Sequence, residues 1–264
     1  MSPHVEYGIS ITPMWPDQAV TIRLAELADE AGLDLIGIQD HPYQWRFYDT
    51  WTLISYLAGR TSQIRLFPDV VNLPLRPPAM LAKSAASLDV LTEGRVELGL
   101  GAGGFWDAVV AMGGPRRFPG EAVEATEEAI DIIRLMWSGE RGVRYEGRHY
   151  RLAGVNTGPQ PTHDIGIWVG ASRPRMLDLI GRKADGWVPS MPWAPPDDLP
   201  AYLHRIAEGA RRVGRDPEDI RCIYNVSGRI GSKVDAEFSG PVSFWVDELA
   251  RIAEIGVDAF IFWP

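Results

Sequence analysis

The sequence of 264 residues contains very little cysteine and lysine. Its one cysteine, Cys222, excludes an intramolecular disulfide bond and any metal cluster held by several cysteines. Only three of its 26 basic residues are lysines, at positions 83, 183 and 233. A Schiff-base enzyme needs a lysine in an apolar pocket. We expect the first two lysines in helices and the third in a loop, which argues against that chemistry.

Long apolar runs and an excess of positive charge are absent as well. No segment approaches the roughly 20 apolar residues that a membrane helix needs, and the N-terminus lacks the charged segment and apolar core of a signal peptide. The net charge of -9 argues against a surface that binds nucleic acid or anionic membranes. The sequence therefore predicts a cytoplasmic protein whose partner is a small organic molecule.

Neither metal-ligand spacing nor a linker is found. His4, His149, His163 and His204 lie in unrelated segments without the spacing of metal ligands, so we expect no metal site. The proline-rich stretch 189–200 is followed at once by a helical pattern and is interpreted as a loop. We therefore expect one domain over residues 1–264.

The sequence does contain a regular alternation of strand and helix patterns. Strands are predicted at 5–11, 35–38, 64–67, within 94–104, and at 165–169, 186–188, 219–230 and 257–262. Helices are predicted at 17–31, 50–59, 78–91, 121–137, 173–184, 197–213 and 242–255. Eight such units are typical of an α/β protein with a closed (β/α)8 TIM barrel, whose site lies at the carboxyl ends of the strands. An open, doubly wound sheet is the alternative.

Two irregularities interrupt this pattern. After the fourth helix, residues 143–152 alternate like a β-hairpin that turns at Glu146-Gly147. The sequence also ends at residues 262–264, where an eighth helix would normally cover the last strand. We expect that side to be exposed, or to be covered by a missing segment or by a second subunit, and a homodimer follows from the last possibility.

The glycine-rich segment 94–104 runs from a short apolar strand into closely spaced glycines, a junction that is typical of ligand contact. Gly99-x-Gly101-x-x-Gly104 also fits the dinucleotide fingerprint of a nicotinamide dehydrogenase. Three strands precede it, however, whereas that fingerprint normally lies in the first β/α turn of its fold. The nicotinamide interpretation is therefore the weaker one.

Polar residues follow several predicted strands and would converge on one rim of the barrel. His41 is the best acid/base candidate because imidazole titrates near neutrality, and Asp40 could orient it. Gly170-Ala171-Ser172 precedes a helix and could hold a phosphate on free backbone N–H groups, with Arg173 as a further donor. The alternative is an ordinary helix cap by Ser172.

Taken together, these segments resemble the bacterial luciferase-like monooxygenase superfamily of flavin- or deazaflavin-dependent oxidoreductases. The resemblance is carried by residues 75–83, 87–91, 94–103 and 184–187 and by Asp40-His41. It implies a flat ring across the barrel mouth, with its phosphate near Gly170, Ala171 and Ser172.

The resemblance also implies roles for other residues. A non-prolyl cis peptide bond is expected at Asp69-Val70, behind the ring. Asn72 matches a polar position that contacts the ring, His41 matches an active-site histidine, and Gly101 and Gly103 are expected to leave room beside the ring.

The cofactor implied by the resemblance is coenzyme F420, a deazaflavin, because the FMN-using branch more often has Glu-His-His where this sequence has Asp40-His41. The expected activity is hydride transfer to or from a small organic substrate. The alternatives are an FMN-dependent monooxygenase and a non-catalytic cofactor-binding protein. Sugar-phosphate dehydrogenases of the superfamily have an acid where this sequence has Gly104, which argues against glucose 6-phosphate as substrate.

Overall fold

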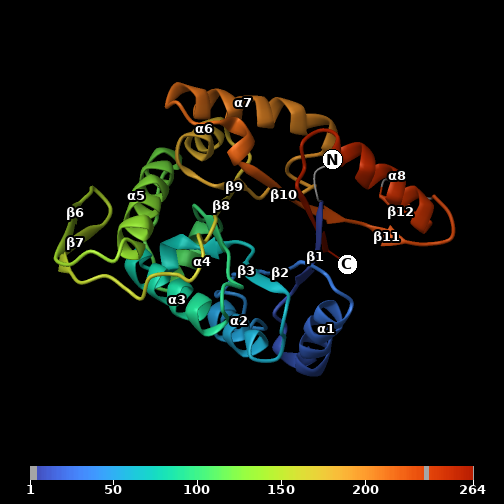
Figure 1. Cartoon of the computed structure of the whole chain (residues 1–264), viewed down its shortest axis with the longest axis horizontal. Helices are drawn as coiled ribbons and strands as arrows, with labels where there is room; N and C mark the ends of the chain where they lie inside the picture. The colour runs from blue at the N-terminus through green and yellow to red at the C-terminus, as the bar shows by residue number, and fades with distance from the viewer. Residues whose placement is uncertain (1–4, 235–237, 264) are drawn as a thin grey trace.

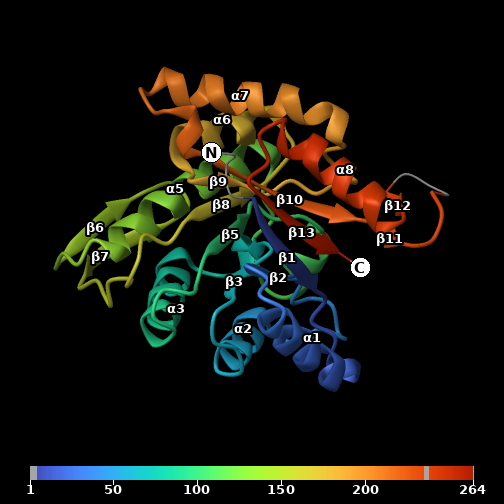
Figure 2. The same cartoon turned by 45° about the vertical axis from the view of Figure 1, so that its right-hand side comes forward.

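The computed structural model describes residues 5–234 and 238–263, so His4 and Pro264 lie outside the described residues. Parallel strands form its centre (Figures 1 and 2). They are β1 (Glu6–Ile11), β2 (Leu35–Ile38), β3 (Arg65–Pro68), β4 (Val71–Asn72), β5 (Leu98–Gly101), β8 (Ile167–Gly170), β9 (Gly186–Trp187), β10 (Arg221–Ser227) and β13 (Ala259–Trp263). Their order in the sheet is β3-β2-β1-β13-β10-β9-β8-β5-β4.

The sheet closes on itself. β3 and β4 are two halves of one barrel strand, interrupted at residues 69–70. Leu66 of β3 forms a parallel bridge with Val96, just before β5. The backbone N–H of Leu66 donates to the carbonyl of Arg95, and that of Glu97 donates to Leu66, both over 3.0 Å. The (β/α)8 barrel is confirmed, and the open sheet, with the nicotinamide fold built on it, is wrong.

Apart from the short helix α4 after β5, the helices pack around the outside of the barrel (Figure 2). They are α1 (Gln18–Glu30), α2 (Thr50–Ala58), α3 (Pro78–Leu91), α4 (Trp106–Ala111), α5 (Pro119–Trp137), α6 (Pro174–Lys183), α7 (Leu199–Arg212) and α8 (Val242–Ala253). The seven predicted helices are all present. The sequence pattern does not predict α4, because six residues are too short to show a helical period.

The predicted hairpin is formed by β6 (Val143–Glu146) and β7 (Arg151–Val155), which pair antiparallel. It projects beyond α5 at the left of Figure 1. Glu128 of α5 anchors its turn, because the carboxylate accepts hydrogen bonds from the backbone N–H groups of Arg148, His149 and Tyr150 over 2.7, 2.9 and 3.0 Å.

Two predicted strands are shorter than expected. Gly94 has a φ of 94°, so the chain is still turning there and the glycine-rich strand begins at Leu98. The strand predicted at 219–230 breaks at Gly228, where a Cβ atom would overlap the carbonyl oxygen of Phe238. The short strands β11 (Arg229–Ile230) and β12 (Ser239–Gly240) form a separate pair after that break.

Alternate residues of the strands fill the barrel interior, among them Phe67 and Trp168, whose ring centroids lie 5.2 Å apart. No helix follows β13 in the described residues. Phe260 on β13 is only 2% exposed, because it stacks on Tyr7 of β1. Apolar exposure lies instead at Tyr7, which is 44% exposed.

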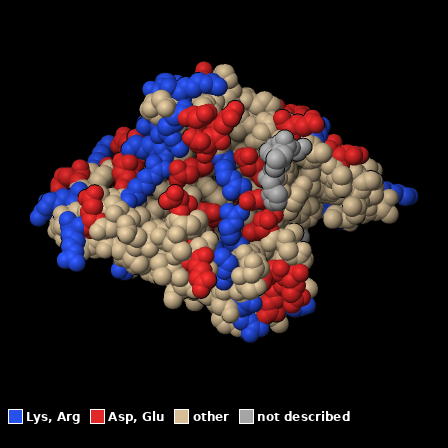
Figure 3. Space-filling view, in the orientation of Figure 1, with Lys and Arg blue, Asp and Glu red and all other residues tan. Residues whose placement is uncertain are grey.

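Basic and acidic side chains are interspersed on the face drawn in Figure 3. Ion pairs join neighbouring helices, such as Arg182 of α6 with Glu127 of α5 at 2.7 Å. Within the described ranges, no helix is both long enough and apolar enough to cross a membrane.

Candidate active site

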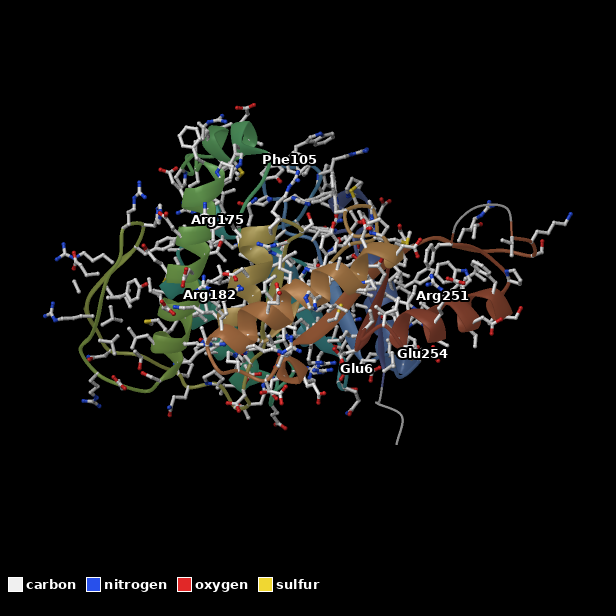
Figure 4. All side chains as sticks on the ribbon, turned by 90° about the horizontal axis from the view of Figure 1, so that it is seen from above. Glu6, Phe105, Arg175, Arg182, Arg251 and Glu254 are labelled. Atoms are coloured by element: carbon white, nitrogen blue, oxygen red, sulfur yellow. The ribbon has the colours of Figure 1, made fainter. Side chains whose placement is uncertain are left out.

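The carboxyl ends of the strands meet at one end of the molecule. Figure 4 shows Phe105, which follows β5, and Arg175, near the start of α6, toward this end, and Glu6, at the start of β1, toward the other. Two adjoining cavities open at the carboxyl ends, each of about 440 Å³. This size lies within the range of roughly 300–1,000 Å³ that is usual for small-molecule sites.

The first, which we call the aromatic cavity, includes Tyr43, Phe105 and Trp106 in its wall. The second, the polar cavity, includes Ser10, Ser190 and Asn225. The two share six wall residues, namely His41, Val70, Gly103, Gly170, Ala171 and Ser172.

All ten residues singled out from the sequence line these cavities. Nine line the aromatic cavity: Asp40, His41, Val70, Asn72, Gly101, Gly103, Gly170, Ala171 and Ser172. Asp69 is the exception, because it lines the polar cavity alone. The structure thus brings the predicted residues together around two cavities, and Asp69 faces the polar cavity with six of the others.

Val70 forms part of the wall between the cavities. The Asp69-Val70 peptide bond is cis, as the resemblance implies. A Cβ atom at Gly101 would lie 2.8 Å from Cγ2 of Val70, and one at Gly170 would lie 3.0 Å from it. The expected reason for the glycine at position 101 is therefore wrong in part: it makes room first for the Val70 side chain rather than for a ring. Gly103 has a different reason, a φ of 104° that favours glycine.

Asp40 is buried, but it does not orient His41 as expected. Arg76 donates to it from Nε and from Nη2, both over 2.7 Å, and the backbone N–H of Asn72 donates over 2.9 Å. Both carboxylate oxygens therefore accept hydrogen bonds, and these bonds connect the loop after β2 with β4 and the segment that follows it. The prediction that Asp40 contacts the imidazole is wrong, because the nearby Arg76 guanidinium is the stronger partner.

The His41 ring is held by Tyr43 instead. Its Nδ1 lies 2.8 Å from the Tyr43 hydroxyl, and its Nε2 has no hydrogen-bond partner among the described residues. Phe105 packs edge-on against the ring, with centroids 5.9 Å apart. Burial lowers the pKa of His41, and the charge of Asp40 offsets this only in part. The imidazole is therefore neutral near pH 7 and can exchange a proton with a molecule in either cavity.

Asn72 is 5% exposed, and its Oδ1 has no hydrogen-bond partner in the described structure. Burial raises the pKa of Tyr43 and so does the charge of Asp40, whereas a hydrogen bond with the Asn72 side chain lowers it. Because a buried polar atom is normally satisfied, the unpaired Oδ1 in the wall of the aromatic cavity indicates a ligand that donates a hydrogen bond.

Helix α6 begins without a side-chain cap in the described structure. Arg173 is the N-cap residue and Pro174 the first helical residue, so the expected alternative of a cap by Ser172 is wrong. The Ala171 carbonyl accepts a hydrogen bond from Nε1 of Trp187 over 2.7 Å, which orders this turn. Ser172 and Arg173 remain at the wall of the aromatic cavity, where an uncapped helix N-terminus favours negative charge.

Asn225 is the residue that sequence reasoning missed. Its Nδ2 donates to Oδ1 of Asp69 over 3.1 Å and lies 3.3 Å from Oγ of Ser190. Burial raises the pKa of Asp69 to about 6, although this hydrogen bond opposes the shift. Asn225 lies within the buried strand β10. The one signal in the sequence that could have indicated its role is that it is a polar residue in an otherwise apolar strand pattern.

Comparison with known proteins decides the family. The sequence profile described as "Luciferase-like monooxygenase" matches residues 7–233. The chain belongs to the luciferase-like monooxygenase family.

Relatives within this family include a 5,10-methylenetetrahydromethanopterin reductase of Methanolobus tindarius, 33% identical over 216 residues that cover 81% of this chain and 62% of the relative. An F420-dependent glucose-6-phosphate dehydrogenase of Nocardia farcinica is 29% identical over 209 residues, 75% of this chain and 61% of the relative. The chain thus spans about three fifths of the length of these relatives.

The solved structure of an F420-dependent secondary alcohol dehydrogenase in complex with an F420-acetone adduct has the same fold. It superposes with a TM-score of 0.89 at 17% identity and covers 98% of this chain and 93% of that one. Within the described ranges, this luciferase-like protein has no group of three or more His, Cys, Asp or Glu side chains arranged to hold a metal ion.

Proposed function

We propose that this protein is an oxidoreductase that uses the deazaflavin coenzyme F420 to transfer a hydride to or from a small organic substrate. The observation that carries the proposal is the wall formed by Val70, which borders a cavity on each side. One cavity suits a flat cofactor ring and the other a substrate. F420 is part of the name of the Nocardia farcinica relative and of the alcohol dehydrogenase structure, which supports the choice of cofactor.

The residues of the aromatic cavity fit such a cofactor. The unpaired Oδ1 of Asn72 would accept a hydrogen bond from the ring, and Val70 and Gly103 would border it. Arg173 and the uncapped start of α6, beside Ser172, suit a phosphate. When bound, the deazaflavin supplies a ring carbon that gives or takes the hydride.

The chain's own residues would do the remaining work. His41 lines both cavities and is neutral near pH 7, so its Nε2 can take a proton from a substrate hydroxyl or, once protonated, return it to a carbonyl oxygen. Tyr43 holds Nδ1 and thereby sets the direction of the ring.

The test is a titration of the purified protein with coenzyme F420 and with FMN, followed by the fluorescence of each cofactor. We expect saturable F420 binding that is tighter than FMN binding, and F420-dependent turnover in a panel of alcohols and ketones. Glucose 6-phosphate, included in the panel, is not expected to react.

Other outcomes would change the assignment. Tighter binding of FMN together with oxygen consumption would indicate a monooxygenase. Binding of F420 without turnover across the panel would indicate a non-catalytic cofactor-binding protein.

We also propose that the protein forms one domain, works in the cytoplasm and acts as a homodimer. The exposed apolar side chains of Tyr7, Leu24 and Leu27, which are 44%, 39% and 44% exposed, support a subunit contact near β1 and α1. Light scattering coupled to size-exclusion chromatography measures the mass directly, and a monomer at micromolar concentration would contradict the dimer.

A further inference from the structure

The polar cavity differs from the aromatic cavity in its charged side chains. Among the described residues that line it, none is Lys or Arg, and Asp69 is the acid. The other polar side chains are His41, which burial keeps neutral near pH 7, and the uncharged residues Ser10, Gln39, Ser172, Ser190 and Asn225. The aromatic cavity, by contrast, has Arg173 in its wall. An anion in the polar cavity would therefore meet a carboxyl group and no fixed cation.

The Asp69 carboxyl is held in place by the fold. A Cβ atom at Gly37 would lie 3.0 Å from Oδ2 of Asp69, so the glycine on β2 leaves the space that this oxygen occupies. Asn225 donates to Oδ1 over 3.1 Å. Oδ2 of Asp69 accepts no hydrogen bond from the described residues, and Oδ1 of Asn225 is also unpaired. Two acceptor atoms from two strands thus stand at this cavity without donors.

We propose that the polar cavity binds an uncharged organic molecule that carries a hydroxyl or carbonyl group, and that Asp69 sets this specificity by excluding anions. A ligand hydroxyl donates to Oδ2, and a protonated Asp69 donates to a ligand carbonyl. A ligand carboxylate or phosphate is repelled by the charged Asp69, since no Lys or Arg in the wall of this cavity offsets that charge. The identification of this ligand as the enzyme's substrate rests on the proposed function; its chemical class rests on the cavity alone.

The exclusion of anions by Asp69 should weaken as the pH falls. Burial raises the pKa of Asp69 to about 6, so the carboxyl is charged at pH 8 and largely neutral at pH 5. His41 is the other titratable group in the cavity wall, and Tyr43 and the Asp40–Arg76 pair lie beside it at the aromatic cavity. Protonation of His41 would also favour anions in acid, so a variant of Asp69 is needed to separate the two effects.

The experiment compares two probes of similar size, cyclohexanol and cyclohexanecarboxylate, by saturation-transfer NMR on the full chain, with and without coenzyme F420. At pH 8 we expect the wild-type protein to bind the alcohol at least about tenfold more tightly than the carboxylate. In Asp69→Asn this ratio should fall about tenfold, because the amide keeps the shape of the carboxyl without its charge. Asp164→Asn is the matched control, an exposed acid before β8 at the opposite end of the barrel, and should keep the wild-type ratio.

A second, independent test compares the probe preference of the wild-type protein at two pH values. Its preference for the alcohol should fall from pH 8 to pH 5 by more than that of Asp69→Asn. Three results would overturn the proposal. They are tighter binding of the carboxylate than of the alcohol at pH 8, the same binding ratio in Asp69→Asn as in the wild-type protein, and failure of both probes to bind. If F420 does not bind but the selectivity is found, the proposed function fails while the assignment of the cavity stands.

Discussion

At the residue scale, His41 is the side chain placed best for proton transfer, since it lines both cavities and is fixed at Nδ1 by Tyr43. We expect His41→Ala to lower kcat by about 10²–10⁴-fold, the usual contribution of a general acid or base, with little change in F420 affinity. Stopped-flow oxidation or reduction of F420 with the best substrate of the panel measures this.

His204→Ala is the control for this prediction, because that exposed histidine lies on α7 beside Glu208. Because burial lowers the pKa of His41, the acid limb of the rate profile should lie below pH 6.5. Full turnover in His41→Ala would show that another group moves the proton.

A second prediction concerns the packing of Gly101 and its effect on stability. A methyl group there would lie 2.8 Å from Val70 and 3.0 Å from the carbonyl oxygen of Val71, so Gly101→Ala should lower the free energy of unfolding by about 1–3 kcal/mol. Gly104→Ala should change it by less than about 0.5 kcal/mol, because a Cβ atom at Gly104 meets nothing within 4 Å. Urea denaturation of the two variants makes the comparison, and equal losses would contradict the packing argument.

At the element scale, the Asp40–Arg76 pair joins the loop after β2 to the segment after β4. The Asp40 side chain is 1% exposed and that of Arg76 is 18% exposed. We expect Asp40→Ala to lower the free energy of unfolding by about 3–5 kcal/mol, because it leaves a buried guanidinium without its main partner. Thermal or urea unfolding measures the loss.

Asp49→Ala is the natural comparison for the Asp40 variant. Asp49 also accepts a hydrogen bond from Arg76, over 2.6 Å, and caps α2, but its side chain is 45% exposed. We expect a smaller loss of about 1 kcal/mol. Equal losses of unfolding free energy in Asp40→Ala and Asp49→Ala would contradict the role of the Asp40–Arg76 pair in holding the loop after β2.

Prediction at the element scale succeeded where a pattern was long and local. The helix at 78–91 begins at a proline, which fits the first turn, and its predicted bounds are those of α3. Failures came where a short segment is shaped by its neighbours. Val96 forms a bridge with Leu66 of β3, but the turn at Gly94, packed near His163, makes the continuous strand begin only at Leu98.

At the scale of the whole molecule, a network of ion pairs joins several strands at the end opposite the cavities. Arg65 of β3 contacts Glu6 of β1 at 2.7 Å and Glu97, before β5, at 2.8 Å. His163 lies 2.8 Å from Asp89 of α3 and 3.7 Å from Glu97. Through Arg65, these contacts connect β1, β3 and the segment before β5.

The pH dependence of stability follows from His163. Glu97 and Asp89 raise its pKa above the ordinary 6.5, although burial opposes them. The folded state therefore binds this proton more tightly than the unfolded state, and the resulting stability is complete below pH 6.5 and is lost as pH rises through the raised pKa. We expect His163→Gln to flatten the fall in unfolding free energy between pH 6 and 8.5, measured by urea denaturation. An unchanged slope would contradict this.

Local patterns were enough to predict the barrel and the end at which the site lies, because strand and helix periodicity is local and residues after parallel strands share one rim. The resemblance of short motifs was enough to predict the family. Which side chains meet across that rim became clear only from the folded structure. Asp40 binds Arg76 rather than His41, Val70 occupies the space at Gly101, and Asp69 pairs with Asn225, 156 positions away. Such contacts depend on how the strands are wound and staggered, which no local pattern encodes.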